Sequence, residues 1–89
     1  RYLRASDLLR AAGDVALLAK TRVNLASAYS ARGEYARAAE ILRETMIASD
    51  REGLDNIRVM AANNLGVIYE RIANFSRALE MYLLAAKEG

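Results

Sequence analysis

The sequence repeats itself with a period of 40 residues along a chain of 89 residues. Shifting the chain by that offset against itself aligns seven identical pairs of residues. The pairs are Gly13/Gly53, Asn24/Asn64, Leu25/Leu65, Tyr29/Tyr69, Arg37/Arg77, Ala38/Ala78 and Glu40/Glu80. A fixed period of this length is typical of proteins built from copied supersecondary units, each of which buries its apolar face only against its neighbours. The chain is therefore expected to form a single repeat domain over residues 1–89.

The apolar residues inside each copy recur with helical spacing. Steps of four and seven residues join Leu18, Leu25 and Tyr29, and a second series runs from Tyr35 to Leu42. Such spacing predicts one buried stripe on each helix. The 18 alanines, the low glycine content and the absence of proline also favour helices. The sequence thus predicts an all-α fold.

Glycines mark the expected ends of the helices. Gly33 interrupts the apolar pattern, while Gly13 and Gly53 are each followed closely by an aspartate that is expected to cap the next helix, Asp14 and Asp55. Five helices are expected, at about residues 1–12, 14–32, 35–52, 55–72 and 75–88. The short connections predict antiparallel neighbours. Residues 1–12 are expected to be the second helix of a truncated repeat, followed by repeats at residues 13–52 and 53–89.

Two series of residues resemble the tetratricopeptide repeat and together span nearly the whole chain. The first is Asn24, Leu25, Ala26, Tyr29, Gly33, Tyr35, Ala38 and Leu42, and the second is Asn64, Leu65, Gly66, Tyr69, Ala73, Phe75, Ala78, Tyr82 and Ala85. The resemblance implies a right-handed superhelical stack of antiparallel helix hairpins. Its usual period is about 34 residues, and the longer period here is similar to that of extended repeats in bacterial regulatory and signalling proteins. The residues expected to be buried are Tyr29, Tyr69, Leu25, Leu65, Ala38, Ala78, Leu42 and Tyr82.

The resemblance also implies a binding surface. Arrays of this family bind extended peptides or partner helices in a concave groove lined by the first helix of each repeat. The candidate groove residues are the first-helix positions outside the expected core: Lys20, Val23, Asn24, Ser27, Ser30, Ala31, Met60, Asn63, Asn64, Val67, Glu70 and Arg71. The clamp of lysine and asparagine that captures a terminal carboxylate in some members is not expected here, because Val23 and Asn63 stand where a clamp lysine would be.

Asn24 and Asn64 are the strongest candidates for residues that bind a peptide. An asparagine side chain offers both donors and an acceptor, so a ladder of them at constant spacing is suited to holding the backbone of an extended peptide. In similar repeats, asparagine at this register does this work. The alternative is that each asparagine hydrogen-bonds to a neighbouring helix and stabilises the packing of the hairpins.

Composition excludes most other functions. The chain has no cysteine and no histidine, which removes disulfides, imidazole metal ligands and catalytic triads. We expect no enzyme activity, no catalytic residue, no metal and no cofactor. The 13 basic and 11 acidic residues alternate along the expected helices, unlike the basic patch of a nucleic-acid binder. No apolar run is long enough for a membrane span, so a soluble, cytoplasmic module that binds a protein or peptide is expected.

The ends of the predicted stack carry apolar residues. Met81, Leu83 and Leu84 stand where the preceding copy has Ile41, Arg43 and Glu44, and residues 1–12 contain Leu3, Leu8 and Leu9. Either these side chains complete the hairpin cores, or further repeats or a second copy cover them. The chain begins with Arg1, so we expect it to be an excerpt. The alternative function is therefore self-association, or a spacer or regulatory segment of a larger signalling or transcription-regulatory protein.

Overall fold

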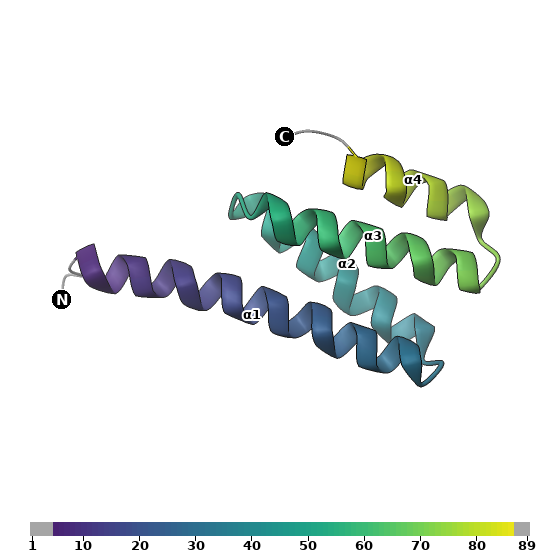
Figure 1. Cartoon of the computed structure of the whole chain (residues 1–89), viewed down its shortest axis with the longest axis horizontal. Helices are drawn as coiled ribbons and strands as arrows, with labels where there is room; N and C mark the ends of the chain where they lie inside the picture. The colour runs from purple at the N-terminus through teal and green to yellow at the C-terminus, as the bar shows by residue number, and fades with distance from the viewer. Residues whose placement is uncertain (1–4, 87–89) are drawn as a thin grey trace.

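The computed structural model describes residues 5–86, with side chains described from residue 13 onward. The helices are α1 (Ala5–Ala31), α2 (Tyr35–Arg51), α3 (Asp55–Arg71) and α4 (Phe75–Ala86). Figure 1 shows α1 and α3 side by side, with α2 behind them and α4 beyond α3. The described part of the chain contains no strand, which confirms the all-α prediction. It also contains no helix that is both long and apolar enough to cross a lipid bilayer.

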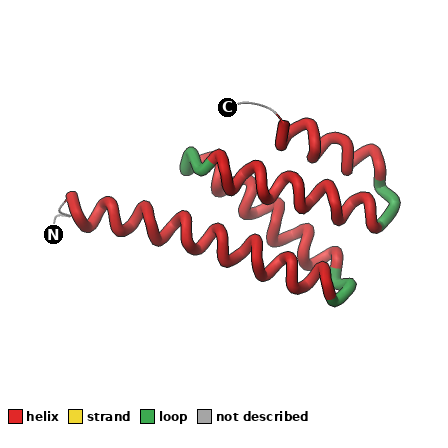
Figure 2. The backbone as a smooth tube through the Cα atoms, viewed as in Figure 1, coloured by secondary structure: helices red, strands yellow, loops and turns green. Residues whose placement is uncertain are grey.

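The three turns between these helices have the same geometry and follow one another every 20 residues (Figure 2). In each turn the backbone N–H of the last residue donates to a carbonyl five residues earlier: Glu34 to Tyr29, Leu54 to Ser49 and Asn74 to Tyr69. The residue before it has a left-handed backbone, as in the Schellman motif that commonly ends helices. Each turn therefore reverses the chain in the same way, and successive helices lie antiparallel.

Glycine fills the left-handed position of the first two turns, but alanine fills it in the third. The φ angle is +81° at Gly33, +70° at Gly53 and +62° at Ala73. For a residue with a side chain, this backbone conformation costs about 1–2 kcal/mol. Glycine avoids that cost, but its larger conformational entropy in the unfolded chain cancels part of the advantage. Replacing Ala73 by glycine is therefore expected to raise the free energy of unfolding by about 0.5–1 kcal/mol.

Urea unfolding of the Ala73→Gly variant measures this gain. The matched control is Gly33→Ala, which places a side chain in the same backbone conformation and is expected to destabilise the protein. A loss of stability on Ala73→Gly would show that the third turn does not need the left-handed conformation.

The helix break expected at Gly13 is wrong, so the described residues form four helices instead of five. Gly13 and Asp14 lie inside α1, and Gly13 has none of the positive φ seen at Gly33 and Gly53. A glycine inside a helix costs only about 1 kcal/mol relative to alanine, and the strong helix formers Ala11 and Ala12 precede Gly13 while Ala16, Leu17 and Leu18 follow within about one turn. Residues 5–12 therefore extend α1 and do not fold back on it.

Two further sequence predictions concern the start of α3 and the ends of the chain. Asp55 is the first residue of α3 and not its cap, which is Leu54. Residues 1–4 and 87–89, including Leu3, lie outside the described residues, as do the side chains of Leu8 and Leu9.

The core is a continuous apolar cluster that begins between α1 and α2 and runs through α3 to α4. Its members are Ala19, Val23, Ala26, Ala38, Ala39, Leu42, Ile57, Ala61, Leu65, Ile68, Tyr69 and Ala78. Burial is confirmed for five of the expected core residues, Ala38, Leu42, Leu65, Tyr69 and Ala78. Tyr29 and Tyr82 are half-buried. Leu25 is 47% exposed, so its expected burial is wrong.

Candidate functional site

A groove with a volume of about 270 Å³ runs between α1 and α3. Ser27, Ser30 and Ala31 of α1 form one wall. Asn64, Val67 and Arg71 of α3 form the other wall, and Tyr35 and Leu42 of α2 form the floor. Helix α2 lies behind α1 and α3 (Figure 1), so its side chains close the groove on that side.

The two walls are copies of one another. On α1, Lys20, Asn24, Ser27 and Ala31 are spaced by four, three and four residues, which places them on one face of the helix. The corresponding face of α3 carries Met60, Asn64, Val67 and Arg71, each 40 residues further along the chain. The repeat period therefore places equivalent side chains on the two faces, and two of these pairs, Ser27 with Val67 and Ala31 with Arg71, line the groove on both walls.

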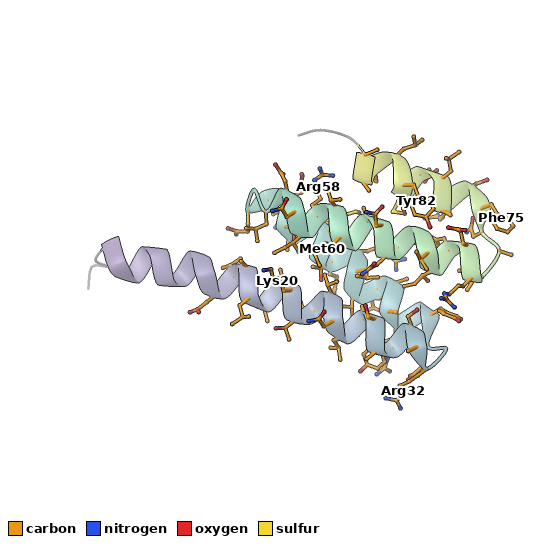
Figure 3. All side chains as sticks on the ribbon, viewed as in Figure 1. Lys20, Arg32, Arg58, Met60, Phe75 and Tyr82 are labelled. Atoms are coloured by element: carbon orange, nitrogen blue, oxygen red, sulfur yellow. The ribbon has the colours of Figure 1, made fainter. Side chains whose placement is uncertain are left out.

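Of the residues predicted for the groove, six line it: Ser27, Ser30, Ala31, Asn64, Val67 and Arg71. Lys20 and Met60 are exposed and lie on the same helix faces, toward the N-terminal side of these lining residues (Figure 3). Asn24 is exposed on α1 beside the groove. The predicted surface is thus assembled mainly at the C-terminal halves of α1 and α3.

Val23 was expected to line the groove but belongs to the core. Its side chain is 2% exposed, whereas Asn63, at the equivalent position of α3, is exposed. Val23 belongs to the core cluster that α1 shares with α2 and α3, whereas Asn63 is not part of that cluster. The prediction for Val23 is therefore wrong, and Asn63 lies outside the groove lining.

Glu70 was also among the groove candidates, but it faces α4. Its carboxylate accepts a hydrogen bond from the hydroxyl of Tyr82 on α4. This hydrogen bond raises the pKa of the Tyr82 phenol, with smaller contributions from burial and from the carboxylate charge. The phenol therefore stays protonated, and keeps donating to Glu70, to a more alkaline pH than an unpaired tyrosine would.

Asn64 supplies the only side-chain amide among the residues that line the groove. Its side chain is half-buried in the wall. Among the described residues, neither Asn64 nor Asn24 makes a side-chain hydrogen bond to another part of the protein. The packing role considered for these asparagines thus has no hydrogen bond to support it. An amide with both donors and an acceptor remains directed at the groove or its rim.

The groove lining combines polar and apolar side chains and carries one positive charge. Two serine hydroxyls, the Asn64 amide and the Arg71 guanidinium alternate with Ala31 and Val67. The lining residues include no carboxylate that would neutralise Arg71 or activate a serine. This arrangement can donate and accept hydrogen bonds along an extended chain and can attract an anionic group at the Arg71 end.

The floor of the groove could not be predicted from the sequence. Tyr35 and Leu42 were interpreted as core residues, and Leu42 is indeed only 1% exposed. They reach the groove because α2 passes behind the gap between α1 and α3. Apolar spacing marks both residues as inward-facing, but it does not show that part of the inward face borders an open groove.

Comparison with known proteins gives one family. The family model described as tetratricopeptide repeat matches residues 17–87. No curated protein and no solved structure matches the chain significantly.

Proposed function

Because this chain belongs to the tetratricopeptide repeat family, whose repeats generally mediate protein–protein interaction, we propose that it binds a peptide or protein partner in the groove between α1 and α3. The two repeats, at residues 13–52 and 53–89, each supply one wall. The proposed role is non-catalytic and cytoplasmic. The chain is further proposed to belong to the extended, 40-residue variety of the family and to form part of a right-handed superhelical stack.

The Asn64 side chain is the observation that carries this proposal. It is half-buried in the groove wall and its amide makes no hydrogen bond to another described residue, so its donors and its acceptor are available to a ligand. An extended peptide presents backbone N–H and C=O groups at regular intervals, and one asparagine amide can pair with both. Binding of a peptide backbone would therefore satisfy Asn64 without requiring a particular side chain in the ligand.

The charges favour a ligand with acidic groups. Lys20 of α1 and Arg71 of α3 lie near opposite ends of the two facing walls. The counterpart of Lys20 on α3 is Met60, which stands eleven residues before Arg71. A helix rises about 1.5 Å per residue, so the two cations are separated by roughly 16 Å along the groove. This separation is about five residues of an extended chain. A peptide with two acidic residues at that spacing would match both ends.

Removing the Asn64 amide is expected to weaken peptide binding about 3- to 10-fold, because one net hydrogen bond contributes about 0.5–1.5 kcal/mol. A suitable probe is the tightest binder from a displayed library of random linear peptides, with affinity measured by calorimetry on Asn64→Ala. Asn63→Ala is the matched control, because Asn63 is adjacent and exposed but does not line the groove.

The expected result is a loss confined to Asn64→Ala and to an Arg71→Ala variant. A selected peptide that binds equally well to the native chain and to both of these variants would contradict groove binding.

A second candidate function is self-association, as in a regulatory segment of a larger signalling protein. It is supported by large apolar side chains that are exposed at both ends of the stack, among them Leu17, Leu25, Phe75, Leu79 and Leu83. These residues lie outside the groove lining, so the two functions do not compete for one surface.

A further inference from the structure

One face of α1 is apolar and exposed although the equivalent face of α3 is buried. This head face consists of Leu17, Thr21, Leu25 and Ala28. Leu17 is 64% exposed and Leu25 is 47% exposed, whereas their counterparts Ile57 and Leu65 are 4% and 0% exposed. In α3 these positions belong to the cluster of buried residues shared with α2. The head face therefore has the composition of a surface that packs against another helix, but none of the described helices covers it.

Thr21 does not make the head face polar. Its hydroxyl donates to the carbonyl of Leu17 at 2.8 Å within the same helix, which leaves its methyl group as the outer surface. Thr45 makes the same bond to the carbonyl of Ile41 at 2.8 Å and is only 1% exposed. A threonine bonded in this way is thus already accommodated in a helix interface of this protein.

The complementary surface lies on α4. Phe75, Leu79 and Leu83 follow one another every four residues and are 60–66% exposed, and they form the tail face. Figure 3 shows Phe75 projecting away from the bundle at the start of α4. The counterparts on α2 are Tyr35, Ala39 and Arg43, the residues 40 positions earlier.

Two of those counterparts, Ala39 and Arg43, pack toward α3. Ala39 is 5% exposed and belongs to the shared core, while Arg43 donates a hydrogen bond of 3.0 Å to the hydroxyl of Tyr69 on α3. The tail face of α4 is thus the repeat equivalent of the surface with which α2 covers α3.

We propose that the tail face of one copy packs on the head face of a second copy and repeats the contact between α2 and α3. This inference rests on the self-association proposed above and does not depend on the groove. The internal interface supplies the template for the contact, because each residue of the head and tail faces has a counterpart there.

The sizes of the side chains support this pairing. Ala39 and Ile68 are about equally far from the turn at Gly53, so they lie at the same level of the antiparallel pair α2 and α3, and both belong to the shared core. In the proposed contact the equivalent residues are large Leu79 and small Ala28. The large and small partners are exchanged, so their combined volume is nearly unchanged, which is the kind of replacement a packed interface tolerates best.

The polar pair of the internal interface is also replaced consistently. Leu83 stands where Arg43 would reach Tyr69, and the equivalent tyrosine is Tyr29. The ring of Tyr29 already has a cation partner, because the Arg37 guanidinium lies 5.4 Å from its centre. Arg37 thus provides a cation at Tyr29, as Arg43 does at Tyr69, and Leu83 adds no second charge to the contact.

The proposed contact joins two different surfaces. It leaves a free head on one copy and a free tail on the other, so further copies can add in the same orientation. A two-fold contact would instead pair tail with tail and leave the head faces exposed. The two arrangements predict different behaviour when only one face is blocked.

The test uses the 89-residue chain with a lysine placed on one face, Leu25→Lys for the head or Leu79→Lys for the tail. Burying an unpaired ammonium is expected to weaken the contact at least about 100-fold. By sedimentation velocity, the native chain is expected to grow in mass with concentration, while each variant alone stays at 9.8 kDa. An equimolar mixture of the two variants is expected to form dimers and nothing larger, because one intact head meets one intact tail.

Ile47→Lys is the matched control. Ile47 is 55% exposed on α2 but lies on neither face, so this variant is expected to associate like the native chain. Circular dichroism checks the folding of each variant, and Leu17→Lys with Leu83→Lys repeats the mixing experiment at more exposed positions.

Three results would overturn the proposal: a native chain that is monomeric at all concentrations, self-association of Leu25→Lys alone, or a mixture of folded variants that stays monomeric. Peptide binding measured on monomeric Leu79→Lys tests the groove separately, so failure of one proposal leaves the other measurable.

Discussion

Replacing Leu65 by alanine is expected to lower the free energy of unfolding by about 2–5 kcal/mol, the range for removing a fully buried leucine side chain. Leu65 is 0% exposed in the core between α2 and α3. The matched change is Leu25→Ala, which alters the same residue type at the same repeat position. Leu25 is 47% exposed, so this change is expected to cost only about 0.5 kcal/mol.

Both variants are best measured by urea unfolding in the Leu79→Lys background. Blocking the tail face keeps the chain monomeric under the proposed association, so that loss of self-association does not add to the effect at Leu25. Equal losses at the two positions would show that a helix covers α1 in the monomer and that the head face is not free.

The second large effect is expected at the crossing of α3 and α4. Gly66 is buried, and a Cβ atom placed on it would lie 2.6 Å from an atom of the Tyr82 ring. Tyr82 lies on α4 against α3 (Figure 3), so the ring or the helix would have to move. Gly66→Ala is therefore expected to destabilise the protein by about 1–3 kcal/mol, more than the helix propensity that alanine adds.

The first repeat indicates how this loss can be reversed. Its equivalent residues are Ala26 and Leu42, which are 0% and 1% exposed. The double change Gly66→Ala with Tyr82→Leu reproduces that pair and is expected to be more stable than the sum of the single changes predicts. Thermal unfolding of the four proteins in this cycle measures the coupling.

Gly13→Ala is the control for helix propensity. Gly13 lies within α1 with no atom within 4 Å of an added Cβ, so alanine there is expected to stabilise the protein by about 0.5–1 kcal/mol. A Gly66→Ala variant that is stabilised to the same extent would contradict the close contact with Tyr82.

The groove could be predicted in part from the sequence. Repeat register and helical spacing were sufficient to select Ser27, Asn64, Val67 and Arg71, because both depend only on positions along the chain. They were not sufficient for Val23, which another helix covers, or for Glu70, which pairs with a side chain on α4. The lack of a hydrogen bond to Asn64, which carries the proposed function, depends on distances that the sequence does not contain.

By itself, the sequence determined the helices from residue 35 onward and the three turns at Gly33, Gly53 and Ala73, because these depend on neighbouring residues. Helical spacing, the left-handed preference of glycine and the 40-residue period all act locally. Even the turn at Ala73, which lacks glycine, forms where the period predicts it.

Only the tertiary structure decided which copies of a repeated position are buried. Leu25 and Leu65 are identical in type and register, yet one is exposed and the other is fully buried. Gly13 likewise resembles Gly53 in sequence but continues a helix instead of ending it. Burial and chain reversal depend on whether another helix is present to pack against, and that is a property of neighbours in space that residues close in sequence do not specify.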